Sequence, residues 1–596
     1  MIRTYRLIWE ILTPSERRRY LLLLGLSVIM SLFEVAGVAV ILPFLKIISD
    51  PTFIHTNWLF IWFQRVTGLK TDHEVTIATG LVVFAVILMG MVVRAAASYA
   101  EIRFGLMRAY SIGRRLLNGY LHQPYVWFLS RNSSDFGQNL LSEIDLVIRE
   151  SVLPAVLLIS NSLITVLIAA FLFAVEPGVA IGATVLLVTV YAVVYRSLRG
   201  WLSRIGGARF IANRDRFQIV NEALGGIKEV KLLGIEAEFL HRFSGPAHAM
   251  AQQQTLGLVI GRLPRFALEA VCYGGFILMV LVMVITRGDA VQNALPTFGL
   301  IGMAGSKLFP SLQMIYTNLA SMRYSTAALE KLHASVTALG DSTTTDDDAA
   351  AVPLHDRLEL RGLQFRYPSA EKDSLYGLSL TIPARTTIGV VGGTGAGKTT
   401  MIDLILGLLR PDAGQVLVDG SVITDNRVRA WQKSLGYVPQ SIFLSDETVA
   451  GNIAFGVDPA RIDLVAVERA ARIANLHDFV MSDLPQGYQT TVGERGVRLS
   501  GGQRQRIGIA RALYHDPDVL ILDEATSALD NLTERAVMEA VQNLGHAKTI
   551  IMIAHRLTTV MNCDTIYLLD HGKVEASGSY DDLVANSATF RRMAQG

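Results

Sequence analysis

The sequence is poor in cysteine, in charge and in repeats, and each shortage excludes a class of protein. Cys272 and Cys563 are the only cysteines among 596 residues, so the chain has neither a disulfide framework nor a cysteine metal set. Charged residues make up only 18% of the chain, and the net charge is +2. The cations cluster beside apolar runs rather than along a duplex-sized face, which excludes nucleic-acid binding. No long-period repeat is present, which argues against a solenoid.

Apolar residues, by contrast, are abundant. They make up 51% of the chain, and the mean hydropathy is +0.37. The C-terminal third has ordinary polarity, so the excess lies N-terminally. Crossing a bilayer takes about 20 apolar residues. Composition alone predicts five spans, and a sixth, which contains Lys307 and two prolines, rests on the family resemblance given below. The six segments are Tyr20–Ile48, Val75–Ala97, Leu153–Val175, Gly178–Tyr195, Phe266–Thr286 and Leu295–Leu319.

Basic residues in the connections predict the orientation of these spans. Arginines precede the first span and follow the second and fourth, which places those segments and both termini in the cytoplasm. The helices after the second and fourth spans continue beyond the membrane, and their tips, residues 123–130 and 225–233, are candidate coupling elements. We expect a membrane domain over residues 1–334, a flexible linker over 335–352 and a second domain over 353–596.

A glycine-rich loop in the second domain predicts a phosphate site. The segment Gly392–Thr399 (GGTGAGKT) follows a buried strand, Ile388–Val391, and opens a helical run. Its glycines let backbone N–H groups turn toward phosphate oxygens, and the helix N-terminus adds partial positive charge. Lys398 would reach the β and γ phosphates, and the Thr399 hydroxyl would hold Mg²⁺. A plain glycine-rich turn is the alternative.

An acidic strand end supplies the second part of such a site. The run Val519–Glu524 (VLILDE) is an apolar strand that ends in two carboxylates. Asp523 would bind the metal, and Glu524 would polarise the attacking water. Taken alone, the same run is often a core strand that ends in solvated acids.

The run Leu499–Gln503 (LSGGQ) indicates the class of protein. With the phosphate loop, the acidic strand and His555 in the run IMIAHR, it resembles the nucleotide-binding domain of an ATP-binding cassette (ABC) transporter. The resemblance implies an all-α membrane domain with six transmembrane helices of exporter type, fused to an α/β P-loop ATPase domain with a helical subdomain. It also implies ATP hydrolysis with Mg²⁺, and no other metal.

The resemblance assigns roles residue by residue. Glu524, His555 and Gln440 match the catalytic positions, and Thr399, Gln440 and Asp523 match the metal ligands. Ser500 matches the serine that caps the γ-phosphate on the opposite subunit, so a homodimer is implied, and Glu494 matches a loop that faces the membrane helices. The nucleotide-binding positions are Tyr367, Gly392, Gly393, Thr394, Gly395, Ala396, Gly397, Lys398, Thr399, Thr400, Ser500, Gly501, Gly502, Gln503 and Asp530.

The transported substrate is predicted from the first span. The run Ser31–Leu45, which contains Glu34, resembles the exporters that flip lipid-linked oligosaccharides built on a polyprenyl diphosphate. Cations at membrane depth, Lys307 with Arg262, Arg265 and Arg94, would hold the diphosphate. In the alternative, Lys307 pairs with Glu34 and the arginines extend to the interface.

An aromatic segment between the first two spans, residues 51–68, predicts a short external helix on the outer leaflet. It would guide a polyprenyl tail or simply anchor the loop. We expect an integral protein of a bacterial cytoplasmic membrane that exports or flips a lipid-linked amphiphile. A general lipid or multidrug exporter and an ATP-gated channel are the alternatives.

Overall fold

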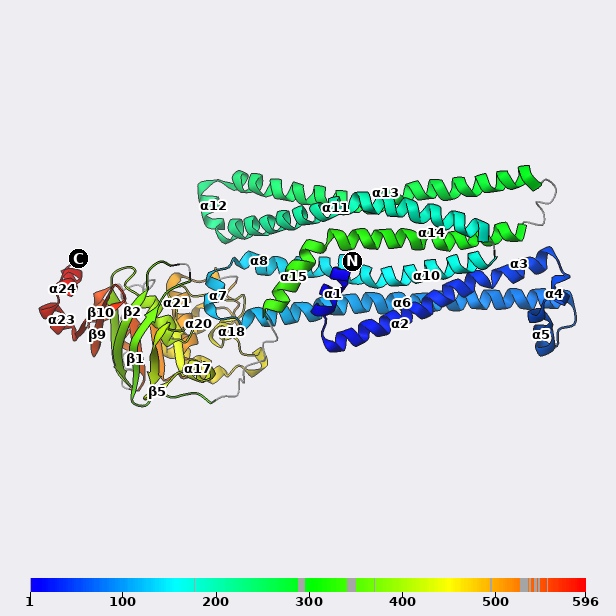
Figure 1. The fold of residues 1–596 in the computed structure, drawn as a ribbon. Helices are drawn as coiled ribbons and strands as arrows, with labels where there is room; N and C mark the ends of the chain where they lie inside the picture. The colour runs from blue at the N-terminus through cyan, green and yellow to red at the C-terminus, as the bar shows by residue number, and fades with distance from the viewer. Residues whose placement is uncertain are drawn as a thin grey trace. The chain divides into compact units, whose positions relative to one another are not determined.

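The computed structural model describes residues 2–175, 177–287, 295–339, 350–368, 370–493, 496–525, 534, 538–540, 544, 547–554 and 556–595. The chain divides into two compact units (Figure 1). The first unit comprises Met1–Gln123 and Arg131–Ser342, and the second comprises Pro124–Ser130 and Thr343–Gly596. The second unit therefore includes a short insert from the N-terminal half of the chain.

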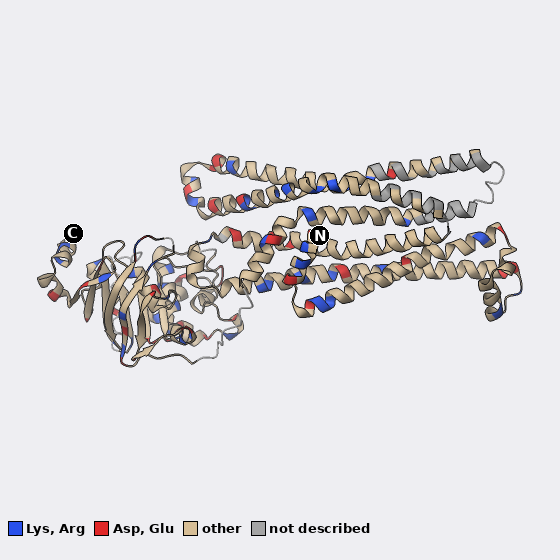
Figure 2. Cartoon of the chain, viewed as in Figure 1, with Lys and Arg blue, Asp and Glu red and all other residues tan. Residues whose placement is uncertain are grey.

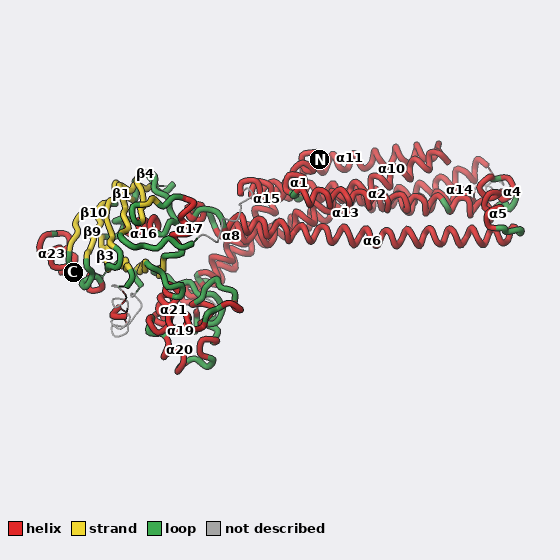
Figure 3. Tube along the Cα trace, turned by 90° about the horizontal axis from the view of Figure 1, so that it is seen from below, coloured by secondary structure: helices red, strands yellow, loops and turns green. Residues whose placement is uncertain are grey.

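In its described part, the first unit consists of helices, drawn in red in Figure 3. The three longest, α6, α11 and α13, contain 50, 49 and 52 residues. At about 1.5 Å per residue each is roughly 75 Å long, more than twice the thickness of a bilayer core. The helices of this unit are α1 (Ile2–Ile11), α2 (Pro14–Ala39), α3 (Ile41–Ser49), α4 (Phe53–Thr56), α5 (Trp58–Thr67), α6 (Asp72–Leu121), α8 (Ser133–Gln138), η1 (Asn139–Glu143), α9 (Ile144–Val147), η2 (Ile148–Val152), α10 (Leu153–Val175), α11 (Pro177–Gly225), α12 (Ile227–Leu233), α13 (Glu236–Arg287), α14 (Leu295–Tyr324) and α15 (Thr326–Leu339).

Three helical segments within the described residues are long and apolar enough to cross a membrane: Pro14–Ser49, Asp72–Leu121 and Ser134–Ala174. The other three expected spans fall within α11, α13 and α14. Charged side chains are absent from α10 and sparse along the middle of α2, as Figure 2 shows. The first expected span is interrupted at Val40, between α2 and α3. Pro43 explains this break, because proline lacks an amide hydrogen and clashes with the carbonyl four residues earlier.

Two contacts fix the packing of the long helices in the first unit. Glu143, at the end of the π-helical turn η1, pairs with Arg209 of α11 at 2.7 Å, and both side chains are buried. Gly206 of α11 lies against the backbone of Tyr324, the last residue of α14. A Cβ atom built at Gly206 would lie 1.8 Å from the Tyr324 carbonyl oxygen. The two helices therefore meet backbone to backbone.

Replacing Gly206 by alanine should lower the melting temperature of the detergent-solubilised protein by several degrees, because overpacking costs about 1–3 kcal/mol. Gly207→Ala is the matched control, since a Cβ at Gly207 meets nothing within 4 Å. Both changes gain the same helix propensity, so their difference isolates the clash. Equal melting temperatures for the two variants would contradict this packing.

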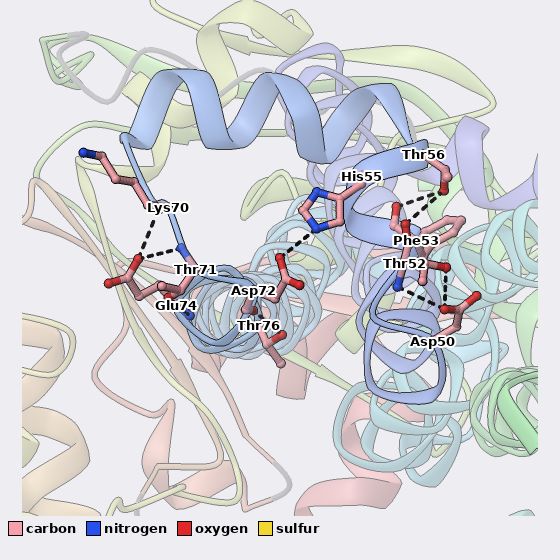
Figure 4. Close-up of polar contacts among 10 residues, drawn as sticks. All are labelled: Asp50, Thr52, Phe53, His55, Thr56, Lys70, Thr71, Asp72, Glu74 and Thr76. Carbon is pink, nitrogen blue, oxygen red and sulfur yellow. Dashed lines mark hydrogen bonds and ion pairs between the residues drawn. The ribbon is translucent and has the colours of Figure 1, made fainter.

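The segment between the first two spans contains the short helices α4 and α5. Polar contacts fix their surroundings, as Figure 4 shows. Asp50 Oδ1 accepts hydrogen bonds from the Thr52 amide at 3.0 Å and from its hydroxyl at 2.6 Å. His55 Nε2 lies 3.0 Å from Asp72 Oδ1, which links α4 to the start of α6. Glu74 closes a capping box with Thr71 at the same end of α6.

Helix α5 has one buried face and one exposed apolar face. Phe60 is buried in a cluster with Ile47, Ile54 and Val75. The opposite side exposes Trp58, Leu59, Trp62 and Val66. The expected helix is therefore present and exposes an apolar face, and its position on the outer leaflet stays a prediction.

The second unit contains two sheets and a set of helices. A four-stranded antiparallel sheet has the order β2-β1-β4-β5, and a six-stranded sheet has the order β10-β9-β3-β8-β7-β6. In the larger sheet the strands from β9 to β6 are parallel. The elements are α7 (Tyr125–Leu129), β1 (Arg357–Phe365), β2 (Leu375–Pro383), β3 (Thr387–Gly392), α16 (Lys398–Ile405), β4 (Ala413–Val418), β5 (Ser421–Val422), α17 (Asp425–Gln432), β6 (Leu435–Val438), α18 (Val449–Ile453), η4 (Pro459–Arg461), α19 (Leu464–Ile473), α20 (His477–Asp483), η5 (Gly487–Gln489), α21 (Gly501–Leu513), β7 (Val519–Asp523), β8 (Thr549–Ile553), η7 (Leu557–Thr559), β9 (Thr565–Asp570), β10 (Lys573–Gly578), α23 (Tyr580–Asn586) and α24 (Ala588–Gln595).

Two buried clusters hold this unit together. One joins both sheets to α16 and includes Leu358, Ile388 and Met401. The other joins α18, α19 and α21 to β7 through residues such as Val467 and Ile507. Helix α7, one of the two candidate coupling elements, belongs to this unit, and Val126 packs against the first cluster.

Candidate functional site

The phosphate loop lies between β3 and α16. Gly397 immediately precedes α16 and has a φ of 98°, a conformation that only glycine adopts readily. A Cβ built there would lie 2.8 Å from the Ser374 carbonyl oxygen. The loop therefore requires glycine at this position for both conformation and space.

Lys398 is the first residue of α16, directly after this loop. It is buried, with less than a tenth of its surface exposed. Its Nζ donates hydrogen bonds to the carbonyl oxygens of Gly392 at 2.8 Å and Gly393 at 3.0 Å. Burial lowers the pKa of the Lys398 ammonium, and the negative charges of Glu524 and Asp523 oppose that shift. The cation is thus close to both carboxylates, while Thr399 beside it is exposed.

The two carboxylates stand at the end of β7. Because β3, β8, β7 and β6 are parallel neighbours, their carboxyl ends lie at one edge of the sheet. Glu524 has a φ of 49°, which is unusual for a residue with a side chain and is common at functional sites. Its Oε2 accepts a hydrogen bond of 2.7 Å from Gln440 Nε2, and its carbonyl accepts one from Gln505. The sheet thereby brings Gln440, Asp523 and Glu524 together.

Tyr367, the expected adenine-stacking residue, is half-buried beside the phosphate-loop helix. Its hydroxyl lies 3.3 Å from the Thr400 hydroxyl, and its ring packs edge-on against Phe365 with centroids 5.0 Å apart. The aromatic ring is therefore next to the loop, and its stacking on adenine stays a prediction.

Ser500 begins helix α21 as its N-cap residue. The Ser500 hydroxyl accepts from the Gln503 amide at 3.2 Å, and the Gln503 side chain accepts from the Ser500 amide at 2.7 Å. This capping box places Ser500, Gly501 and Gly502 at a helix N-terminus, where backbone N–H groups favour an anion.

Three expected site residues, His555, Asp530 and Glu494, lie outside the described residues. Their roles stay predictions.

Two polar residues near the carboxylates were missed by the sequence analysis. Tyr437 on β6 places its hydroxyl 3.4 Å from Asp523 Oδ2. Asp403 on α16 is 9% exposed, and burial and the charge of Asp523 raise its pKa to about 6. Asp403 is the one acidic residue in the apolar run Met401–Leu409, and this isolation is a signal from which it could have been predicted.

In the membrane half, Glu34 joins two cations. Its Oε2 lies 2.6 Å from Lys307 Nζ, and its Oε1 accepts from Arg94 at 3.1 Å. The alternative interpretation of Lys307 is therefore the observed arrangement, because Lys307 pairs with Glu34. Arg262 and Arg265 are exposed on α13, and Arg265 pairs with Glu269 at 2.6 Å.

Comparison with known proteins decides the family. Residues 375–527 match the family model described as ABC transporter, and residues 22–288 match the ABC transporter transmembrane region. An ATP-dependent lipid A-core flippase of Cupriavidus pinatubonensis (strain JMP 134 / LMG 1197) is 30% identical over 487 residues, which cover 80% of each chain. The chain belongs to the ABC transporter family. It joins a membrane region and an ATPase region in one polypeptide, and its ATP hydrolysis is coupled to transport.

Further similarities agree with this assignment. An ATP-dependent lipid A-core flippase of Pseudomonas aeruginosa (strain PAO1) is 33% identical over 385 residues, 64% of this ABC transporter and 62% of that protein. The solved structure of a bacterial Atm1-family ABC exporter with ATP bound shares the fold, with a TM-score of 0.76, 24% identity and coverage of 97% of this chain and 98% of that one. The fold class and the enzyme class expected from the sequence are thereby confirmed.

Replacing Gln440 by alanine should slow ATP turnover about tenfold to a hundredfold, because Glu524 loses the amide donor that orients it. Binding of ATP, measured with a fluorescent analogue, should change less than about twofold. Gln432→Ala is the matched control, since its Nε2 donates to the Leu406 carbonyl instead. Unchanged turnover in Gln440→Ala would remove this glutamine from the catalytic group.

Proposed function

We propose that two copies of this chain form an ATP-driven flippase for a lipid-linked amphiphile with a phosphate head group, namely a polyprenyl-diphosphate oligosaccharide. The observation that carries the proposal is the cluster of Glu34, Lys307 and Arg94. It combines one carboxylate with two cations, so it keeps a net charge of one positive unit among apolar helices. Such charge at membrane depth is costly and marks a substrate path.

The homodimer is supported by the position of Ser500. A helix N-terminus with a serine and two glycines suits the γ-phosphate held by Lys398 of a second copy. Two nucleotides would then lie in the seam between the copies. Inverting a two-state population from 1:99 to 99:1 takes about 5.5 kcal/mol of differential binding, which two nucleotides can supply.

The residues at the sheet edge fit Mg²⁺. Thr399, Asp523 and Gln440 offer a hydroxyl, a carboxylate and an amide oxygen, which are the hard oxygen donors this ion prefers. When bound, the ion would neutralise charge on the phosphates. Asp523 is buried at this edge, and Gly397 has no space for a side chain.

Hydrolysis follows from the geometry of Glu524. Its carboxylate, oriented by Gln440, would polarise a water molecule for attack on the γ-phosphate. His555 would contact that phosphate, and Asp530 and Glu494 would relay the state of the site to the second copy and to the membrane helices. Loss of the γ-phosphate removes its contacts with Ser500, and the dimer reopens.

Glu524→Gln should keep ATP binding and slow hydrolysis by at least about a hundredfold, because the amide cannot polarise water. With ATP and Mg²⁺ the variant should accumulate as a closed dimer, measured by cross-linking of cysteines introduced at the seam. Glu371→Gln, an exposed carboxylate, is the control. Turnover at the normal rate in Glu524→Gln would refute the role given to this residue.

The substrate is supported by charge and by relatives. In an outward-open state, release of Lys307 and Arg94 from Glu34 would give a diphosphate two charge-assisted donors. Two relatives bear the name ATP-dependent lipid A-core flippase. A lipid A-type glycolipid is therefore the second candidate, and the exposed aromatic face of α5 suits either lipid at the outer leaflet.

Lys307→Ala should lower the amount of lipid-linked oligosaccharide flipped per ATP hydrolysed by about tenfold in proteoliposomes, because one diphosphate donor is lost. Lys331→Ala, an exposed lysine on α15, is the control. The same assay with lipid A and with neutral amphiphiles separates the rival substrates. An equal flipping ratio in Lys307→Ala and the control would eliminate the diphosphate clamp, and passive ion currents in a bilayer would indicate a channel.

The membrane in which the protein lies, and its orientation there, are proposed from the positions of the arginines and from the relatives. Arginines precede the first span and follow the second and fourth, which supports a cytoplasmic location of both termini. Both lipid A-core flippases described above come from bacteria, which supports the bacterial cytoplasmic membrane as the location of this protein.

A further inference from the structure

Tyr437, which is half-buried, has no role in the mechanism above. It lies opposite Ile521 in the β6–β7 pairing, and Asp523 lies two residues further along β7. The Tyr437 hydroxyl donates to Asp523 Oδ2 at 3.4 Å. The side chain therefore approaches the expected metal ligand from the neighbouring strand. Asp403, another buried polar residue without a role in the mechanism, is 9% exposed and lies on α16, five residues after Lys398.

Electrostatics agrees with the contact between Tyr437 and Asp523. Burial, then the charges of Asp523 and Asp403, raise the pKa of the Tyr437 phenol.

We propose that Tyr437 is a positioning residue for Asp523. A hydroxyl donor on Oδ2 would hold the plane of the Asp523 carboxylate in the orientation that a bound metal ion requires, as partners of metal ligands commonly do. This inference rests on the metal role proposed for Asp523.

The test is a direct measurement of metal binding. Mn²⁺ replaces Mg²⁺, and free Mn²⁺ is followed by electron paramagnetic resonance with the full-length protein, ATP and the Glu524→Gln background, which prevents turnover. Tyr437→Phe should raise the Mn²⁺ dissociation constant about tenfold, since loss of such a partner typically costs tenfold to a hundredfold. Tyr567→Phe is the matched control, because its hydroxyl donates to the Thr381 carbonyl at 2.5 Å, away from Asp523. Equal dissociation constants for the two variants would overturn the positioning role.

A third variant separates the two proposals. If Asp523→Asn leaves Mn²⁺ binding unchanged, the metal role of Asp523 fails. If Asp523→Asn weakens binding and Tyr437→Phe does not, only the positioning role fails.

Discussion

Parallel pairing of β3, β8, β7 and β6 is the constraint on which the ATPase unit depends. Residues from three distant parts of the sequence meet because each follows a strand, and parallel strands end at one edge. The phosphate loop follows β3, the two carboxylates end β7, and Gln440 follows β6. Burial of these strands on both faces fixes their register, since Ile388, Leu520 and Ile551 are fully buried. The arrangement of polar groups at this edge of the sheet therefore depends on the packing of the buried strands.

The membrane half obeys a different constraint, which is the cost of charge in an apolar environment. Glu34 is 9% exposed and bonds to Lys307 and Arg94, so three ionisable groups share one position among the helices. Removing one partner from such a cluster leaves the others unpaired. The resulting loss of stability is larger than the stability that the intact pair contributes. The two cations can therefore exchange Glu34 for a bound anion, but removal of any one of the three groups is unfavourable.

Much of this organisation was predictable from the sequence. Apolar runs of about 20 residues predicted the spans, and the motifs around Lys398, Ser500 and Asp523 predicted the ATPase unit, because both signals are local. The contacts between Tyr437 and Asp523, and between Glu143 and Arg209, could not be predicted. They depend on strand order and on helix packing. The partners are 86 positions apart in the first contact and 66 positions apart in the second, and a single sequence carries no signal for such distant pairs. The pairing of Lys307 with Glu34 was one of two open alternatives, and only the packing of α14 on α2 and α10 chose between them.

The contact between Gly206 and Tyr324 has a consequence for how motion passes through the helices. Gly257 of α13 faces the Tyr324 ring, so three long helices converge on one residue. Gly206 of α11 meets the backbone of that residue, and where backbones touch, no rotamer can adjust to absorb a displacement. A movement of the end of α14 is therefore passed directly to α11, whereas α13 meets an aromatic side chain.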